Sequence, residues 1–368
     1  MRGKLASLLP VLVALAAVAP GSAAAAPAKA DVKIWRTATV PPKAKPGQRL
    51  VRILRIHYRA HDGARRRAYV VLPFWYGKGN NPPIPLVISP HGRGVSARAN
   101  AKLWGALPNT GTFAVISPEG SGRALARYSW GSYGQIEDLS RMPAIARRTL
   151  TWLKIDRRRI YAFGGSMGGQ ETLLLLARYP ELLAGAAAFD AVTDFARQYR
   201  SFPAIPCDKR CHETWHGPIG TSLQSLARQE TGGTPKTRAF AYTVRSPVTY
   251  ARSIAASCVP LQLWWSRSDR IVVNQHLQTG ALFRRIKELN PRAPVEAYVG
   301  YWAHSHEMRA KARLPLALSA FGLIPSHSRT LARGMNVVPR PESAPRCGAG
   351  RAPAKPHGSA AKAPRRQR

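Results

Sequence analysis

The stretch that decides the fold is Arg159-Ile160-Tyr161-Ala162-Phe163-Gly164-Gly165-Ser166-Met167-Gly168-Gly169. Its first five residues predict a buried strand, and residues 170–179, which precede a proline, predict a helix. The Gly-x-Ser-x-Gly pattern between them is typical of a sharp turn that presents a serine side chain at the end of a strand. The sequence therefore predicts a strand, a glycine-rich turn and a helix, with Ser166 as a candidate nucleophile.

The same alternation of strand and helix extends along the chain on both sides of this turn. Residues 51–72 form two apolar alternating runs around Asp62-Gly63, which predicts a hairpin. Further strands are expected at 86–89, 113–117, 183–189, 261–265 and 295–299, and helices at 138–153 and 274–289. Strands that alternate with helices favour an α/β fold, in which helices cover both faces of a mostly parallel sheet.

The two ends of the chain differ in composition from its middle, and we expect the folded domain to span residues 31–335. Arg2 and Lys4 precede an apolar run at 5–18 and small residues at 21–26, the order of a secretory signal peptide. Cleavage after Ala26 or Ala30 would give a secreted protein without a membrane span, and a retained membrane anchor is the alternative. Residues 336–368 are rich in alanine, proline and basic residues, which predicts a disordered tail.

Residues 195–245 interrupt the alternation and have no clear period. Loops at the carboxyl ends of parallel strands shape binding sites, so we expect this segment to be an insertion that covers the site as a lid. The chain has four cysteines, for which we prefer the pairs Cys207–Cys211 and Cys258–Cys347, while the other pairings and free thiols stay open.

The chain carries 56 Lys and Arg residues against 18 Asp and Glu, a formal net charge of +38. A net charge of this size bears on what the protein binds rather than on its fold. The basic residues are spread along the sequence without a zinc-finger, RRM or helix-turn-helix signature, so no specific nucleic-acid binding is expected. Attraction to an anionic cell wall, lipid or polymer and a composition bias without a partner both remain open.

A serine hydroxyl needs a base that takes its proton, and the base needs an acid that orients it. In this kind of fold the acid and then the histidine follow the serine, each after a later strand. Asp269 comes shortly after residues 261–265 and is the preferred acid. Asp190 and Asp194, which follow the preceding predicted strand, are the alternatives.

Two histidines, His304 and His306, follow the last predicted strand. We prefer His304 as the base because it lies closer to the strand end. An imidazole suits this role because its pKa lies near the working pH, so it can take up and then release a proton.

The oxyanion that forms during attack on a carbonyl needs N–H donors. The backbone N–H of Met167, directly after the serine, is one candidate. The second is expected from His91-Gly92-Arg93-Gly94, with Arg93 preferred and His91 itself structural.

These segments resemble the catalytic domain of the prolyl oligopeptidase family of α/β-hydrolases. The resemblance covers roughly residues 84–325 and rests on Ile155-Asp156, Arg159-Ile160-Tyr161, Gly168-Gly169, Ser246-Pro247-Val248-Thr249-Tyr250, Asp269-Arg270-Ile271-Val272 and the histidine loop. It implies the α/β-hydrolase fold and hydrolysis of peptides, or of esters in many relatives, by Ser166, Asp269 and His304.

Two features depart from the family pattern. The remaining residues are too few for the N-terminal propeller that restricts larger members to short peptides, which counts against peptidase activity. Ser266 ends the strand before Asp269 where relatives usually have glycine, and we expect it to alter a turn. A small ester is therefore the preferred substrate, a peptide the alternative, and no cofactor is expected.

A second motif, His212-Glu213-Thr214-Trp215-His216, fits the H-E-x-x-H pattern of zinc proteases. That pattern needs a continuous helix, and Gly217-Pro218 follows at once, so we expect no metal here. A zinc metalloprotease that uses His212, Glu213 and His216, and a non-catalytic protein that binds surfaces through its charge, are the alternative functions.

Overall fold

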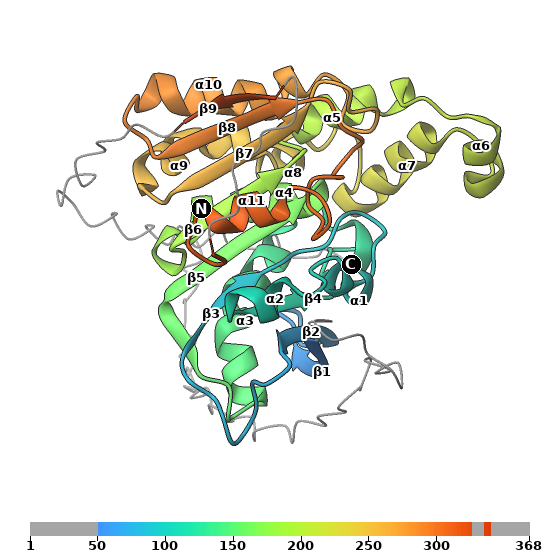
Figure 1. Ribbon diagram of the computed structural model, residues 1–368. Helices are drawn as coiled ribbons and strands as arrows, with labels where there is room; N and C mark the ends of the chain where they lie inside the picture. The colour runs from blue at the N-terminus through green and yellow to red at the C-terminus, as the bar shows by residue number, and fades with distance from the viewer. Residues whose placement is uncertain (1–50, 326–334, 340–368) are drawn as a thin grey trace, which may run out of the picture.

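The computed structural model describes residues 51–325 and 335–339 (Figure 1). Its strands are β1 (Val51–Arg59), β2 (Arg65–Pro73), β3 (Ile84–Ile88), β4 (Ala114–Pro118), β5 (Ile155–Gly165), β6 (Gly185–Phe189), β7 (Leu261–Ser266), β8 (Val295–Gly300) and β9 (Asn336–Val338). They form one sheet in the order β1-β2-β4-β3-β5-β6-β7-β8-β9. Strands β3 to β8 pair in parallel, while β1, β2 and β9 are antiparallel to their neighbours. The predicted hairpin and the mostly parallel sheet are confirmed.

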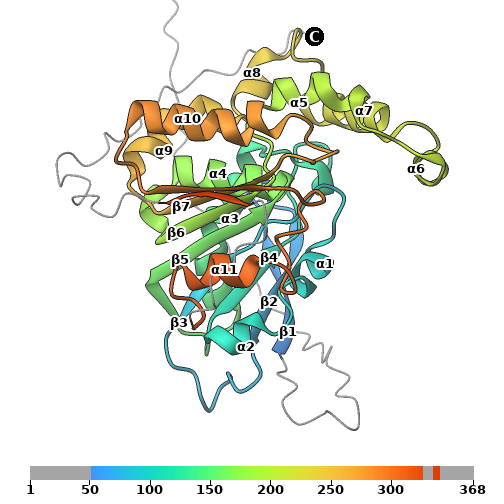
Figure 2. The same cartoon turned by 45° about the horizontal axis from the view of Figure 1, so that its top comes forward.

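Helices cover both faces of this sheet (Figure 2). One face packs against α3 (Tyr133–Thr149), α4 (Met167–Arg178), α9 (Ala251–Ser257) and α10 (Thr279–Leu289), and the other against α1 (Ala97–Lys102), α2 (Leu107–Gly111) and α11 (Leu314–Ser319). Side chains alternate between the two faces along each strand. In β7, Leu263 and Trp265 belong to the first core and Trp264 to the second. Burial on both sides explains why the central strands read as continuous apolar runs.

The segment predicted as an insertion, residues 195–245, lies between β6 and β7 and is largely helical. It contains α5 (Phe195–Ser201), α6 (Lys209–Trp215), α7 (Ile219–Thr231) and α8 (Ala239–Thr243), and α6 stands out from the rest of the molecule in both views (Figures 1 and 2). Three of these helices have seven residues or fewer, about two turns, which is too short to produce a clear apolar period. We refer to residues 195–245 as the insertion.

The predicted tail begins too early. Asn336–Val338 forms β9, which pairs with β8 at the edge of the sheet. A strand of three residues leaves no periodic signal in the sequence. The predicted signal peptide and the rest of the predicted tail lie outside the described residues.

The predicted disulfide Cys207–Cys211 is present in the insertion. Cys258 is disulfide-bonded as well, whereas Cys347 lies outside the described residues. Within 51–325 and 335–339, every helix is too short or too polar to cross a membrane.

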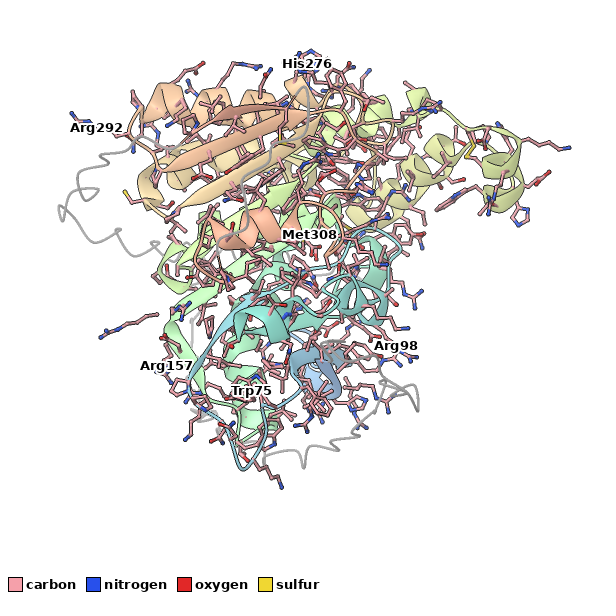
Figure 3. All side chains as sticks on the ribbon, viewed as in Figure 1. Trp75, Arg98, Arg157, His276, Arg292 and Met308 are labelled. Atoms are coloured by element: carbon pink, nitrogen blue, oxygen red, sulfur yellow. A yellow bond between two sulfur atoms is a disulfide. The ribbon has the colours of Figure 1, made fainter. Side chains whose placement is uncertain are left out.

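Basic side chains extend outward from several sides of the molecule. Arg98, Arg157 and Arg292, all exposed, point away from the ribbon on different sides (Figure 3). Within the described residues, basic side chains therefore lie on several sides of the molecule rather than beside one element.

Candidate active site

Ser166 occupies the turn between β5 and α4. Its φ of 58° and ψ of −126° lie in a region that residues other than glycine rarely adopt. The backbone N–H of Ser166 donates to the carbonyl oxygen of Phe189 in β6 at 2.8 Å. The serine therefore stands on a strained turn that is held against the end of the neighbouring strand.

Two glycines are needed for the chain to pass through this turn. A Cβ atom on Gly164 would lie 2.3 Å from the carbonyl oxygen of Gly168. A Cβ atom on Gly168 would lie 2.4 Å from the carbonyl oxygen of Pro90. Neither approach is possible for real atoms, so the Gly-x-Ser-x-Gly spacing is a steric requirement of this turn.

The segment His91–Gly94 also lies against the serine. A Cβ atom on Gly92 would be 3.9 Å from Cβ of Ser166. The backbone N–H of Arg93 has no hydrogen-bond acceptor among the described residues, and that of Met167 lies in the first turn of α4, where N–H groups have no partner within the helix. Both predicted oxyanion donors thus belong to segments in contact with Ser166.

His91 is buried, with 1% of its surface exposed, and supports this segment from inside. Its Nδ1 lies 2.8 Å from the carbonyl oxygen of Gly92. Burial lowers the pKa of His91, which favours the neutral imidazole. A neutral ring that bonds the adjacent carbonyl agrees with the structural role expected for it.

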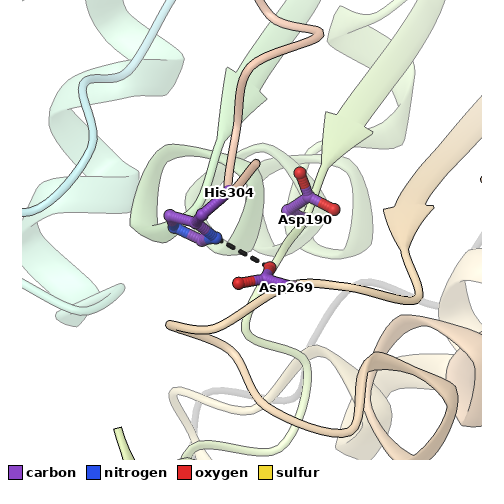
Figure 4. Close-up of side chains that lie close together, drawn as sticks. All are labelled: Asp190, Asp269 and His304. Carbon is purple, nitrogen blue, oxygen red and sulfur yellow. Dashed lines mark hydrogen bonds and ion pairs between the residues drawn. The ribbon is translucent and has the colours of Figure 1, made fainter. Parts of the chain in front are cut away.

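Asp269 and His304 meet at the carboxyl end of the sheet (Figure 4). Nδ1 of His304 lies 2.7 Å from Oδ2 of Asp269. The other carboxylate oxygen accepts from the backbone N–H groups of Ile271 and Val272 at 2.8 and 3.0 Å. Because its oxygens have fixed donors, the carboxylate can hold the imidazole in one orientation.

The loop that carries His304 packs against the serine turn. A Cβ atom on Gly165 would lie 3.1 Å from Oγ of Ser305. Nε2 of His304 is buried and has no hydrogen-bond partner among the described residues, so a bond to Oγ of Ser166 is not formed in this structure. Such catalytic bonds often tighten only when substrate binds.

His306 occupies a different environment from His304. Its Nδ1 lies 3.1 Å from Oε1 of Glu307, and about half of its side chain, 48%, is exposed. Glu307 is also paired with Arg313 at 2.7 Å. Of the two histidines that the sequence left open, only His304 contacts the predicted acid.

Asp190, an alternative acid in the sequence, lies beside this pair but has other partners (Figure 4). It is fully buried and accepts from the backbone N–H groups of Ser266 and Ser305 at 2.7 and 2.8 Å and from the indole N–H of Trp302 at 2.8 Å. Asp190 thus connects the end of β7 with the histidine loop, a role that sequence reasoning missed. Burial raises the pKa of Asp190 to about 6.

Asp194, the remaining alternative, accepts from the backbone N–H of Arg197 at 2.8 Å and caps α5. It makes no hydrogen bond to a histidine within the described part of the chain.

Ser266, where related sequences usually have glycine, does more than alter a turn. Its hydroxyl donates to the carbonyl oxygen of Trp302 at 2.6 Å and accepts from the backbone N–H of Trp302 at 2.9 Å. The Ser266 side chain therefore joins the end of β7 directly to the segment that leads to His304.

Solved structures with a similar arrangement come from several organisms. A putative dipeptidyl aminopeptidase IV from Bacteroides ovatus matches 75% of this chain at 15% identity with a TM-score of 0.52. Fluorophosphonate-binding serine hydrolase F from Staphylococcus aureus matches 74% at 14% identity with a TM-score of 0.52, and prolyl oligopeptidase B from Galerina marginata matches 74% at 14% identity with a TM-score of 0.50. The chain has the α/β-hydrolase fold.

These proteins differ in how much of their own length this chain matches. The alignment covers 36% of the Bacteroides and Galerina chains and 98% of the Staphylococcus hydrolase. This chain thus spans about a third of the length of the two peptidase-named relatives. By sequence alone, neither a protein-family profile nor a curated protein matches the chain.

The α/β-hydrolase core brings three candidate metal ligands together at the site, namely Asp190, Asp269 and His304, whose ligand atoms lie within 4.8 Å of one another. Each carboxylate oxygen already accepts from at least one N–H group. A metal ion would have to replace these bonds, so the group fits a hydrogen-bonded network better than a cation site.

The H-E-x-x-H motif does not form a zinc site in this fold. Helix α6 ends at Trp215, and His216 follows it with a φ of 51°, in the left-handed region. The two histidines are therefore not presented by a continuous helix, as the zinc-protease pattern requires. The nearby disulfide also removes both cysteine thiolates as ligands.

The insertion packs against the residue that follows the nucleophile. Met167 belongs to a buried cluster with Phe195, Phe202 and Leu223 of the insertion. Glu230 of α7, which is fully buried, accepts from the backbone N–H groups of residues 123–125 at 2.6–2.8 Å and from Arg245 at 2.9 Å. These contacts fix α7 to the core of the α/β-hydrolase fold.

Proposed function

We propose that this chain is a serine hydrolase that acts through an acyl-enzyme intermediate. Oγ of Ser166 attacks a carbonyl carbon while Nε2 of His304 takes up the hydroxyl proton. Asp269 keeps Nδ1 of the imidazole protonated and stabilises the imidazolium that forms. The backbone N–H groups of Met167 and Arg93 donate to the oxyanion.

The proton then travels from His304 to the oxygen or nitrogen of the leaving group as the carbonyl re-forms. A water molecule, deprotonated by the same imidazole, attacks the acyl-enzyme and releases the acid. The observation that carries this proposal is the 2.7 Å bond between His304 and Asp269. The loop that carries His304 also packs against Gly165, the residue before the strained Ser166.

A small carboxylic ester is the substrate that we propose first. The match of 74% of this chain to nearly the whole of a serine hydrolase, 98% of its chain, supports a single-domain hydrolase. Peptide hydrolysis is the second candidate, because two of the similar structures carry peptidase names.

A fluorophosphonate probe tests the proposal, because it reacts covalently with an activated serine. We expect the purified protein to be labelled on Ser166 in peptide mapping, and Ser166→Ala and His304→Gln to abolish labelling. EDTA should change neither labelling nor ester hydrolysis. Hydrolysis that is lost with EDTA and needs His212 would support the zinc alternative, and no labelling with no turnover of esters or peptides would support the non-catalytic binder.

We also propose that the protein is secreted after removal of its N-terminal signal peptide. The Cys207–Cys211 disulfide supports an oxidising destination. N-terminal sequencing of protein recovered from the medium should begin at Pro27 or Asp31. Retention of Met1 in the membrane fraction would contradict this.

The net charge of +38 supports a further proposal, weak attraction to an anionic wall or polymer. Retention on an immobilised polyanion should fall steeply as salt rises. Retention that is absent even at low salt would leave composition bias as the explanation.

A further inference from the structure

Arg93 connects the two sides of the proposed active site. Its backbone belongs to the segment in contact with Ser166, and its guanidinium lies over the ring of Trp215 at the end of α6, with 5.8 Å between Cζ and the ring centroid. The side chain therefore extends from the predicted oxyanion position to the most protruding helix of the insertion (Figure 1).

This guanidinium has no carboxylate partner among the described residues, although it is half-buried. Glu213, on the same helix as Trp215, is exposed and does not pair with it. The buried Arg245 of the insertion, in contrast, is bonded to Glu230 at 2.9 Å. Removing a cation from water without a counter-ion is costly, and an aromatic ring offsets only part of that cost.

Two aromatic residues, Tyr128 and Trp130, connect the Arg93 segment with Met167, the residue after the nucleophile. A Cβ atom on Gly94 would lie 3.0 Å from the hydroxyl of Tyr128, whose ring contacts that of Trp130 at 5.5 Å between centroids. The backbone N–H of Trp130 donates to Sδ of Met167 at 3.3 Å. A chain of contacts thus connects the Arg93 segment with Met167, the other proposed oxyanion donor.

We propose that Arg93 and Trp215 form a subsite for a carboxylate or phosphate carried by the substrate. This inference rests on the proposed function and narrows its substrate class to esters with an anionic group near the scissile bond. The planar guanidinium can bind such a group through two parallel hydrogen bonds, and stacking on Trp215 holds its plane in place.

Two esters of matched length test the subsite: the mono-4-nitrophenyl ester of glutaric acid, which has a free carboxylate, and its methyl ester, which is neutral. The quantity to compare is the ratio of kcat/KM for the anionic ester to that for the neutral one. This ratio cancels any general loss of turnover caused by a change beside the oxyanion position. We expect the natural chain to favour the anionic ester.

In Arg93→Gln the ratio should fall about 10- to 100-fold, the usual range for one charge-assisted interaction. Arg93→Lys should retain part of it, and Trp215→Ala should lower it less than Arg93→Gln. Arg292→Gln is the matched control, because Arg292 is an exposed arginine before the amino end of β8, away from the site, and its loss changes the net charge equally. Equal ratios in Arg93→Gln and Arg292→Gln would overturn the subsite.

A binding measurement separates failure of the subsite from failure of the proposed function. Calorimetric titration with glutarate should show binding that Arg93→Gln weakens and Ser166→Ala does not. If neither ester is hydrolysed but this pattern appears, the hydrolase proposal fails and the anion site stands. If both esters are hydrolysed and glutarate binding does not depend on Arg93, the hydrolase proposal stands and the anion site is wrong.

Discussion

The indole N–H of Trp302 donates to the buried carboxylate of Asp190 at 2.8 Å, which anchors the histidine loop to the end of β6. The same carboxylate accepts from the backbone of Ser266, at the end of the strand that precedes Asp269. The acid and the base of the proposed triad are therefore positioned by a third group that takes no part in proton transfer.

Asp190→Asn is expected to lower kcat/KM about 10- to 100-fold, as loss of a supporting partner often does. The amide keeps the size of the carboxylate, but one of its ends donates, so at least one of the three N–H groups loses its acceptor. The rate of fluorophosphonate labelling should fall in parallel. Asp194→Asn, which affects only the cap of α5, is the control and should leave the labelling rate close to its original value.

His304→Gln and His306→Gln should differ strongly although the two residues are neighbours. The first removes the base and should lower kcat about 10⁴-fold or more. The second removes a half-exposed ring whose partner, Glu307, retains Arg313, so kcat should change little. Ester hydrolysis by both variants measures the difference, and equal losses would contradict the assignment of His304.

Glu230→Gln should destabilise the fold by roughly 3–5 kcal/mol, because it leaves the Arg245 guanidinium buried without its counter-ion. Urea unfolding measures this change. Glu288→Gln is the comparison, because Glu288 forms an exposed pair with Arg285 and such pairs contribute little. A loss in Glu230→Gln as small as that in Glu288→Gln would show that this buried ion pair does not stabilise the insertion.

The buried carboxyl group of Glu171 should make the free energy of unfolding depend on pH. It is fully buried beside Ser129 and Gln135, and burial raises its pKa from 4.5 to about 7. The folded state then binds a proton that the unfolded state releases, so this contribution is present below about pH 4.5 and is lost as pH rises through about 7.

Between about pH 5 and pH 8 the natural chain should therefore lose on the order of 1–3 kcal/mol more unfolding free energy than Glu171→Gln, whose amide mimics the protonated acid. Denaturant unfolding at both pH values provides the comparison. Equal pH dependence in the two proteins would mean that Glu171 does not hold this proton.

Site residues that belong to a local pattern, or that follow closely after a strand, could be predicted from the sequence alone. Gly164 and Gly168 frame Ser166 at a fixed spacing, and few acidic residues compete with Asp269, so the serine and the preferred acid could be named. The choice between His304 and His306 rested only on distance from the strand, and it is the partners of each ring that separate them.

The role of Asp190 could not be predicted from the sequence. Its partners Ser266, Trp302 and Ser305 lie 76, 112 and 115 residues further along the chain, so only the packed fold brings them together. The contact between Arg93 and Trp215 was hidden for the same reason. The sequence places Arg93 beside the predicted oxyanion position, but no local pattern places Trp215 next to it.

The end of β6 has a consequence for how such a protein can diversify. Phe189 accepts from the backbone of Ser166, and the next residue, Asp190, bonds the segments that carry Asp269 and His304. A single dipeptide thus ties together the supports of the reacting groups, and the insertion begins only a few residues later. Helix α6 of the insertion, none of whose residues is fully buried, can change during evolution without moving these supports, so the surroundings of the site can vary while the supports are kept.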